Sequence, residues 1–263
     1  MELGIMWESE ASGSGRSGPG YIHADLIRAA CAEFIGMLLF LFFVITIARF
    51  LPGDEVVALA TSATTMISFG FGLSIFVLVY ILADVSGANL NPAVSAGLLV
   101  ARRISVERFF IYIIAQTLGA IAGAFIATTF MDSTEGGYNS VASNVTEIDA
   151  FGGEVLCTFL LVTTVFAATD GVLGKKHGHI NALLPFAIGM TVLLAHLVLI
   201  PVDGCSINPA RSLATSVTNN NWENHWVFWI GPLVGGVLAA IVWEVILRPA
   251  QPVKAIVANT SVV

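Results

Sequence analysis

Six long apolar segments are the feature of this sequence that most restricts its fold. Each is close to the ~20 residues that an α-helix needs to cross the hydrocarbon core of a bilayer. The 263-residue chain is 56% hydrophobic and only 11% charged, whereas a typical soluble domain has about 25% charged residues. The sequence therefore predicts an all-α membrane protein with six transmembrane helices, at residues 26–49, 59–83, 107–130, 152–170, 181–201 and 226–248.

Two shorter apolar stretches, 91–100 and 208–217, do not fit that count, and each begins with Asn-Pro-Ala. Proline is favoured at the first helical position because its missing N–H would have no intrahelical partner there. A helix of about 10 residues is ~15 Å long, which is roughly half a bilayer. The preceding loops, 86–90 and 204–207, would then dip into the membrane, where backbone must face protein or a water-filled cavity. We expect two re-entrant half-helices whose N-termini meet at mid-membrane.

The chain also repeats itself. In each half an acidic residue inside a span, Glu33 or Glu154, precedes an Asn-Pro-Ala motif. Each half holds three spans and one half-helix, and because three is odd the second half must be inverted relative to the first. Inverted repeats place a permeation site near the midplane. The predicted organisation is an N-terminal tail (1–24), a first inverted repeat (25–130), a connecting loop (131–150), a second repeat (151–248) and a C-terminal tail (249–263).

Charge sets the expected orientation. Lys and Arg gather in the tails and in the loops of one side, whereas the opposite loops are mostly acidic. The positive-inside rule then places both termini in the cytoplasm. Asn144-Val145-Thr146 is a glycosylation sequon in a loop that would face outward, and residues 1–20 have no signal-peptide core. The net charge of −7 reflects several acids in the tail and loops and indicates no nucleic-acid partner.

The two motifs suggest a mechanism. The N-terminus of each half-helix carries about half a positive charge, which disfavours a cation where the two meet. A water molecule that accepts hydrogen bonds from both asparagine amides points its own hydrogens outward, and this breaks the chain along which a proton hops. One Asn-Pro-Ala is an ordinary turn signal. Two copies that open short apolar stretches in opposite halves form a specific pattern: Asn91, Pro92, Ala93 and Asn208, Pro209, Ala210.

Residues 87–94 and 206–212 resemble the signatures of the aquaporin family, and the likeness extends from about residue 24 to 248. Residues 184–211 and 225–232 are most similar to plant-type plasma-membrane intrinsic proteins. The resemblance implies a water channel in the plasma membrane that assembles as a homotetramer. The three cysteines show no paired spacing, and the spans hold no nucleophile–base pair or metal-ligand cluster, so the sequence predicts no enzyme, cofactor or metal site.

The resemblance also assigns an outer constriction, by offset from the two motif asparagines. A bulky ring opposite a guanidinium would leave a hole about one water wide, and the guanidinium would repel cations. The constriction residues are Phe71, His196, Cys205 and Arg211. The resemblance further implies that Glu33 and Glu154 accept hydrogen bonds from the backbone of the re-entrant loops. We interpret Asp84 as a cytosolic or vestibule residue.

Regulation is a further expectation from plant-type relatives, in which the loop between spans four and five (here 171–181) caps the cytoplasmic mouth. Counting back from Ile188-Gly189 places an acid-responsive histidine at His179, with His177 nearby. An unperturbed histidine titrates near pH ~6.5, within reach of cytosolic acidification. The other interpretation is a solvated basic loop. Ser105 follows Arg102-Arg103 and resembles a kinase site, where a phosphate would add a charge of about −1.5 to −2.

Alternatives remain open at this point. A glycerol-type facilitator of the same fold would be expected to carry Asp after the motif arginine and a small residue in place of His196, but this chain has Ser212 and His196. An ion-coupled transporter also uses inverted repeats and broken helices, yet only Glu33 and Glu154 are candidate intramembrane acids. A structural junction protein would keep the fold in a mostly closed state.

Overall fold

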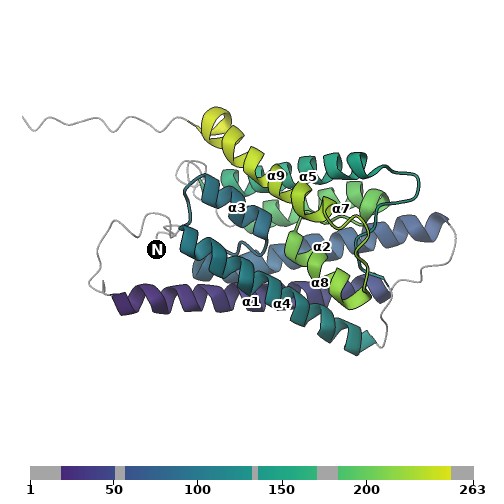
Figure 1. Cartoon of the computed structure of the whole chain (residues 1–263), viewed down its shortest axis with the longest axis horizontal. Helices are drawn as coiled ribbons and strands as arrows, with labels where there is room; N and C mark the ends of the chain where they lie inside the picture. The colour runs from purple at the N-terminus through teal and green to yellow at the C-terminus, as the bar shows by residue number, and fades with distance from the viewer. Residues whose placement is uncertain (1–18, 51–56, 132–135, 171–182, 250–263) are drawn as a thin grey trace, which may run out of the picture.

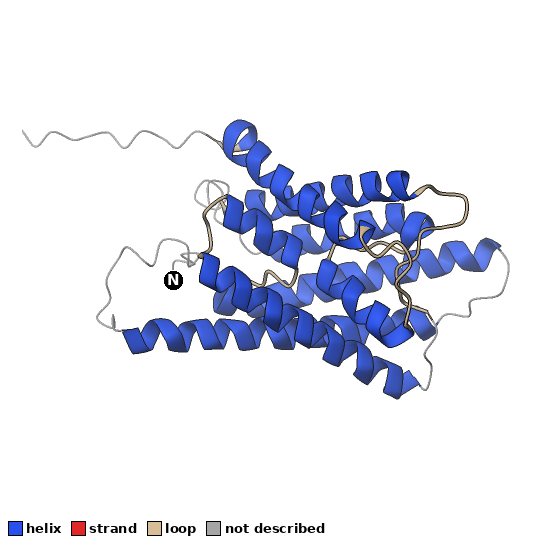
Figure 2. Cartoon of the chain, viewed as in Figure 1, coloured by secondary structure: helices blue, strands red, loops and turns tan. Residues whose placement is uncertain are grey.

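The computed structural model describes residues 19–50, 57–131, 136–170 and 183–249. Within these ranges the regular structure is entirely helical (Figure 2), and six helices are long and apolar enough to cross a membrane. This confirms the predicted fold class. The six are α1 (Pro19–Phe50), α2 (Val57–Ser86), α4 (Val106–Met131), α5 (Glu147–Thr169), α7 (Leu184–Asp203) and α9 (Val227–Val242), which continues in a π-helical turn (Trp243–Leu247). The half-helices are α3 (Pro92–Val100) and α8 (Pro209–Asn219).

Helix ends differ from the apolar runs where local capping decides them. α5 begins at Glu147 rather than 152 because Thr146 caps it, and the Thr146 hydroxyl oxygen accepts from the N–H of Asp149 at 3.2 Å. The acidic residues in the first turn, Glu147 and Asp149, also stabilise this end of the helix, because their negative charge interacts favourably with the positive end of the helix dipole. α7 extends to Asp203, two residues past the predicted span 181–201, and Asp203 is fully buried. Hydrophobicity marks the part of a helix within lipid and not where its hydrogen bonding ends.

The long helices pair in a way that follows the repeat. α1 packs along α4 in the first half, and α5 packs along α9 in the second. The two half-helices lie among the long ones, α3 toward one end of the molecule and α8 toward the other (Figure 1). α3 packs mainly on α9, and α8 packs mainly on α4. Each half-helix therefore packs against the third transmembrane helix of the opposite half.

Glycine allows the closest of these contacts. A Cβ atom added at Gly119 or Gly123 of α4 would lie 2.2 Å from the carbonyl oxygen of Phe34 or Leu38 on α1. At Gly235 of α9 it would lie 2.4 Å from a carbonyl oxygen of α5. In lipid the hydrophobic effect does not drive helices together, so close backbone approach at small residues is a main source of packing energy. The two repeat-related helix pairs, α1–α4 and α5–α9, are thus both held together by close backbone contact at glycine.

Candidate functional site

The two re-entrant loops share one backbone conformation. In each loop the residues four, three and one positions before the motif asparagine have positive φ, between 46° and 86°. They are Gly87, Ala88 and Leu90 in the first loop and Gly204, Cys205 and Ile207 in the second. A non-glycine residue in this region costs about 1–3 kcal/mol and persists only where its surroundings impose it. The loops therefore need strong external support.

Two buried carboxylates supply that support. Glu33 accepts hydrogen bonds from the backbone N–H groups of Asn89 (2.9 Å) and Leu90 (2.7 Å). Glu154 accepts from the two equivalent N–H groups of the second loop, at 2.6 and 2.7 Å. Both glutamates are fully buried. Hydrogen bonds to an ionised acceptor are roughly twice as strong as neutral ones, which fits the task of holding strained backbone.

Further polar side chains support each loop through hydrogen bonds, and the sequence motifs did not predict these contacts. Asn89 Nδ2 donates to Ser95 Oγ at 3.1 Å, and Gln116 Nε2 donates to Glu33 Oε2 at 2.8 Å. At the equivalent place in the second half, the hydroxyls of Ser206 and Ser212 lie 2.6 Å apart. In each half these contacts tie a loop residue to the second turn of its own half-helix.

The motif asparagines face each other's loops at the ends of the half-helices. Each amide oxygen accepts from an N–H in the first turn of its own half-helix, at 2.8 Å for Asn91 and 3.1 Å for Asn208. Asn91 Nδ2 donates to the carbonyl of Ile207 at 2.6 Å, and Asn208 Nδ2 donates to that of Leu90 at 2.8 Å. Each amide oxygen is thus directed at the first turn of its own half-helix, and one N–H of each amide is used by the opposite loop, which leaves the second N–H of each amide as a donor for the cavity. Asn208 Nδ2 also lies 4.0 Å from the thioether sulfur of Met37, which is only a weak acceptor.

Both asparagines line a cavity of about 170 Å³. Its walls are mostly apolar, and it runs from His196 past the two asparagines to Asp84, Thr169 and Leu184 at the other end. Asp84 is thus an exposed residue at the cavity mouth. Residues of both loops, among them Ala88, Leu90 and Ile207, also line the cavity. An apolar wall with a few fixed polar groups on one side suits the passage of a small neutral molecule.

The four residues assigned to the outer constriction lie at the His196 end of that cavity. The Phe71 and His196 ring centroids are 3.9 Å apart, and the Arg211 guanidinium carbon is 5.4 Å from the Phe71 ring centroid. Their exposed fractions are only 3% for Phe71, 1% for His196 and 3% for Arg211, so a sphere the size of water barely reaches them. Cys205 is fully buried in the adjoining turn. These four side chains therefore offer almost no surface to solvent at this level.

Arg211 is held by groups that sequence reasoning did not identify. Its Nη2 donates to the carbonyl of Gly204 at 3.3 Å, and its Nη1 donates to the side chain of Asn139. Asp203 Oδ1 accepts from the N–H of Cys205 at 2.9 Å and so fixes the turn that carries Gly204. Asn139 lies in the loop between α4 and α5 and belongs to none of the motifs found in the sequence.

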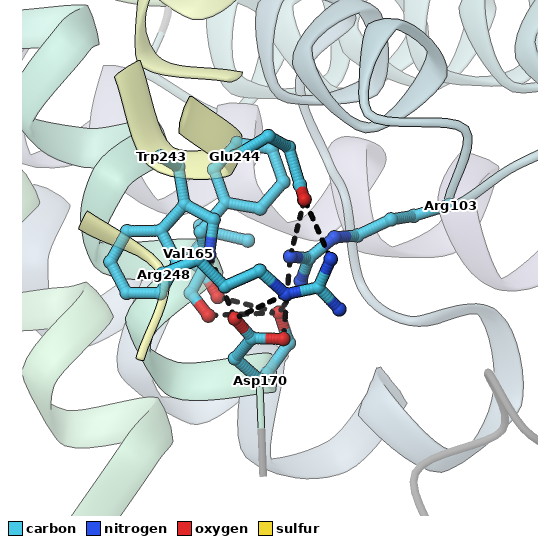
Figure 3. Close-up of polar contacts among 8 residues, drawn as sticks. Arg103, Val165, Asp170, Trp243, Glu244 and Arg248 are labelled. Carbon is cyan, nitrogen blue, oxygen red and sulfur yellow. Dashed lines mark hydrogen bonds and ion pairs between the residues drawn. The ribbon is translucent and has the colours of Figure 1, made fainter. Parts of the chain in front are cut away.

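At the other end of the cavity an ion cluster joins three elements (Figure 3). Arg103, just after α3, lies 2.8 Å from Glu244 and 3.4 Å from Asp170 at the end of α5. Arg248 lies 2.7 Å from Glu244 and 3.4 Å from Asp170, and Trp243 Nε1 donates to Asp170 at 2.8 Å. Two cations and two anions balance here. From the sequence, Arg103 was interpreted only as a cytoplasmic positive charge and as part of a kinase recognition site. In the structure its ion pairs with Asp170 and Glu244 anchor the end of α3.

The regulatory candidates are placed only in part. Ser105 is exposed, and its hydroxyl oxygen accepts from the N–H of Arg108 at 3.2 Å in the first turn of α4. Asn144 is exposed next to the residues that cap α5. His177 and His179 lie outside the described residues, as does the whole of the 171–181 loop.

A comparison with known protein families matches residues 21–243 to the model of the major intrinsic proteins. The chain belongs to this family. Aquaporin PIP1-1 of Oryza sativa subsp. japonica is 43% identical over 244 residues, which cover 90% of this chain and 84% of that protein. An aquaporin PIP-type protein of Atriplex canescens is 44% identical over 231 residues, 85% of this chain and 81% of that protein. This major intrinsic protein is therefore an integral membrane protein, as predicted.

Among solved structures, the aquaglyceroporin of Plasmodium falciparum superposes with a TM-score of 0.74. The match covers 85% of this chain and 98% of that one at 23% sequence identity. At that identity the likeness shows the shared fold. It supports the assignment of α3 and α8 as the two re-entrant half-helices of an inverted repeat.

Proposed function

We propose that this major intrinsic protein is a passive water channel that excludes ions and protons. The observation that carries the proposal is the pair of asparagine amides, Asn91 and Asn208, fixed as donors in the middle of an apolar cavity. A water molecule between them must accept from the protein and direct its hydrogens away, which interrupts proton transfer. The half-helix N-termini add positive potential at the same place.

The second element of the proposal is the outer constriction. Arg211 adds a buried positive charge beside the Phe71 ring, with its guanidinium carbon 5.4 Å from the ring centroid. His196 Nδ1 lies 2.8 Å from the carbonyl of Val192, so this nitrogen carries the hydrogen. His196 Nε2 then faces away as an acceptor, and it has no other hydrogen-bond partner among the described residues. The relatives named as aquaporins favour the same function.

A glycerol or small-solute facilitator is the alternative function. The structural neighbour named above is an aquaglyceroporin, so the fold itself accommodates that use. The Phe71 and His196 side chains argue against it here, because two bulky rings lie together at the constriction, where a three-carbon solute needs more room than water.

Further features of the proposal follow from the family resemblance. The channel is a homotetramer in the plasma membrane, with both termini and the 171–181 loop on the cytoplasmic side. Ser105 is a phosphorylation site whose product would lie at the N-terminus of α4, where a negative charge is stabilised. His179, with His177 as the nearby alternative, is the candidate for closure by cytosolic acid, and Asn144 is the candidate glycosylation site.

Stopped-flow shrinkage of proteoliposomes tests the proposal. We expect water flow well above that of empty vesicles, no proton leak with an internal pH dye, and slow glycerol entry. Arg211→Ala is expected to keep water flow and to admit glycerol and protons. Water flow equal to that of empty vesicles, with protein incorporation verified, would overturn the proposal. Fast glycerol entry in the wild type would favour the facilitator.

A further inference from the structure

The loop that joins α4 to α5 folds back onto the constriction. Its backbone pairs with the end of α7: the N–H of Ser140 donates to the carbonyl of Asp203 at 3.0 Å, and that of Ala142 donates to Val202 at 2.9 Å. This pairing carries the Asn139 side chain inward, where it is 2% exposed. A polar side chain this deeply buried requires partners, because an unpaired amide in such a place is costly.

Every polar atom of the Asn139 amide has a partner. Its oxygen accepts from Arg211 Nη1 and from Ser212 Oγ, the latter at 2.7 Å. Its nitrogen donates to the carbonyl of Asp203 at 3.3 Å. The oxygen faces only donors and the nitrogen faces an acceptor, so the orientation of the amide is determined. The side chain thus connects the guanidinium, Ser212 at the second turn of α8 and the end of α7.

We infer that Asn139 is a positioning residue for selectivity, which holds the Arg211 guanidinium in the constriction without cancelling its charge. This inference rests on the proposed function. An arginine side chain has several rotatable bonds, and Gly204 alone gives it one carbonyl at 3.3 Å. The amide oxygen of Asn139 supplies the second fixed acceptor. Because an amide is neutral, Asn139 adds no charge that would offset the positive charge of Arg211, which repels cations.

Two substitutions separate position from charge. Asn139→Ala removes the acceptor, and the loss of one hydrogen bond to a charged group changes the occupancy of the held position by roughly tenfold. Asn139→Asp keeps oxygen acceptors of the same reach but places a negative charge beside the guanidinium. Ser140→Ala is the matched control, since Ser140 contacts Asp203 through its backbone N–H.

The experiment measures water, glycerol and monovalent-cation permeability in the same proteoliposomes. Asn139→Ala is expected to keep water flow and to raise glycerol entry about tenfold. Asn139→Asp is expected to exclude glycerol as the wild type does and to admit more cations. If Asn139→Ala does not incorporate, Asn139→Ser, whose hydroxyl is too short to reach Arg211, takes its place.

A double-mutant cycle excludes a merely structural role. In the Arg211→Ala background, Asn139→Ala should change glycerol entry no further, because the group that it positions is gone. Full additivity, an Asn139→Ala variant that matches Ser140→Ala, or equal glycerol leak through the Ala and Asp variants would each overturn the inference. Wild-type vesicles without water flow would instead remove the proposed function, so the two failures are distinguishable.

Discussion

The rings of Phe71 and His196 lie against each other, with centroids 3.9 Å apart and planes inclined by 32°. No solute passes between two rings at that separation, so the passage at this level runs beside them, past Arg211. His196→Ala should open the space that the imidazole fills. We expect glycerol permeability to rise about tenfold or more, since the fit of a few atoms in a pocket is worth ~1–3 kcal/mol. Stopped-flow light scattering with a glycerol gradient measures this.

The control for that variant is Leu197→Ala on the next position of α7, where the side chain is 40% exposed on the outer surface. Its glycerol permeability should match the wild type. Unchanged glycerol entry in His196→Ala would show that another residue sets the width of the pore.

Close backbone approach makes a second prediction. Gly119→Ala would place a Cβ atom 2.2 Å from the carbonyl oxygen of Phe34, and because that atom is backbone the helices must separate. Overpacking of this kind costs about 1–3 kcal/mol or more. We expect a clearly lower thermal unfolding midpoint in detergent. Gly152→Ala on α5 is the control, because a Cβ there meets nothing within 4 Å, and alanine favours the helix. Equal midpoints for the two variants would contradict the packing argument.

A third prediction concerns the ion cluster at the end of α3. Arg103→Ala removes a side chain that is 12% exposed and leaves Asp170, 9% exposed, with less of its partner charge. Hydrogen bonds to charged groups are worth ~1.5–3 kcal/mol each, so the loss of stability should be of that order. Arg248→Ala should cost less than about 1 kcal/mol, because Arg248 is 44% exposed and solvent screens it. Denaturant unfolding in mixed micelles compares the two, and the reverse order would refute the assignment of Arg103 as the anchor.

A fourth prediction concerns pH. His225, in the loop before α9, accepts a hydrogen bond from Trp229 Nε1 at 3.0 Å and lies 3.1 Å from Ser216 Oγ. Partial burial lowers the pKa of His225 from its usual value of 6.5. The folded state therefore binds the proton less readily than the unfolded state. The contribution of this histidine to stability is complete above pH 6.5 and is lost as pH falls below it toward the folded pKa.

Unfolding midpoints between pH 8 and pH 5 test this, with His225→Asn as the comparison. The wild type should lose stability on acidification, and the variant should lose less of it. Parallel curves would show that another group titrates in this range.

Much of the fold followed from the sequence because a bilayer leaves few solutions. Long apolar runs must be spanning helices, and a proline-initiated half-length run between them must be re-entrant. The constriction residues, such as His196 and Arg211, were assigned from the family resemblance, and the structure brings them together. What the sequence could not reveal depends on tertiary contact. Asn139 stands in a loop without periodicity, and only the folded loop brings it to Arg211.

Capping and charge pairing were missed for related reasons. Asp203 fell outside the predicted span because hydropathy indicates only the part of a helix that lies in lipid. In the structure α7 continues to Asp203, and this residue is buried. Arg103 looked like exposed positive charge because its partners, Asp170 and Glu244, lie far along the chain. The acidic residues Glu33 and Glu154 were predicted to support the loops from their repeat-equivalent positions, and that expectation depended on the family resemblance.

The exchange of hydrogen bonds between Asn91 and Ile207, and between Asn208 and Leu90, has a consequence for biosynthesis. Each half of the chain supplies the carbonyl that completes the other half, and each half-helix rests on a span made by its counterpart. The first half therefore leaves the ribosome with an unfinished loop at mid-membrane, and it reaches its final form only after the second half has been inserted. Maturation is a joining of two interdependent halves, and a pore exists only once both are present.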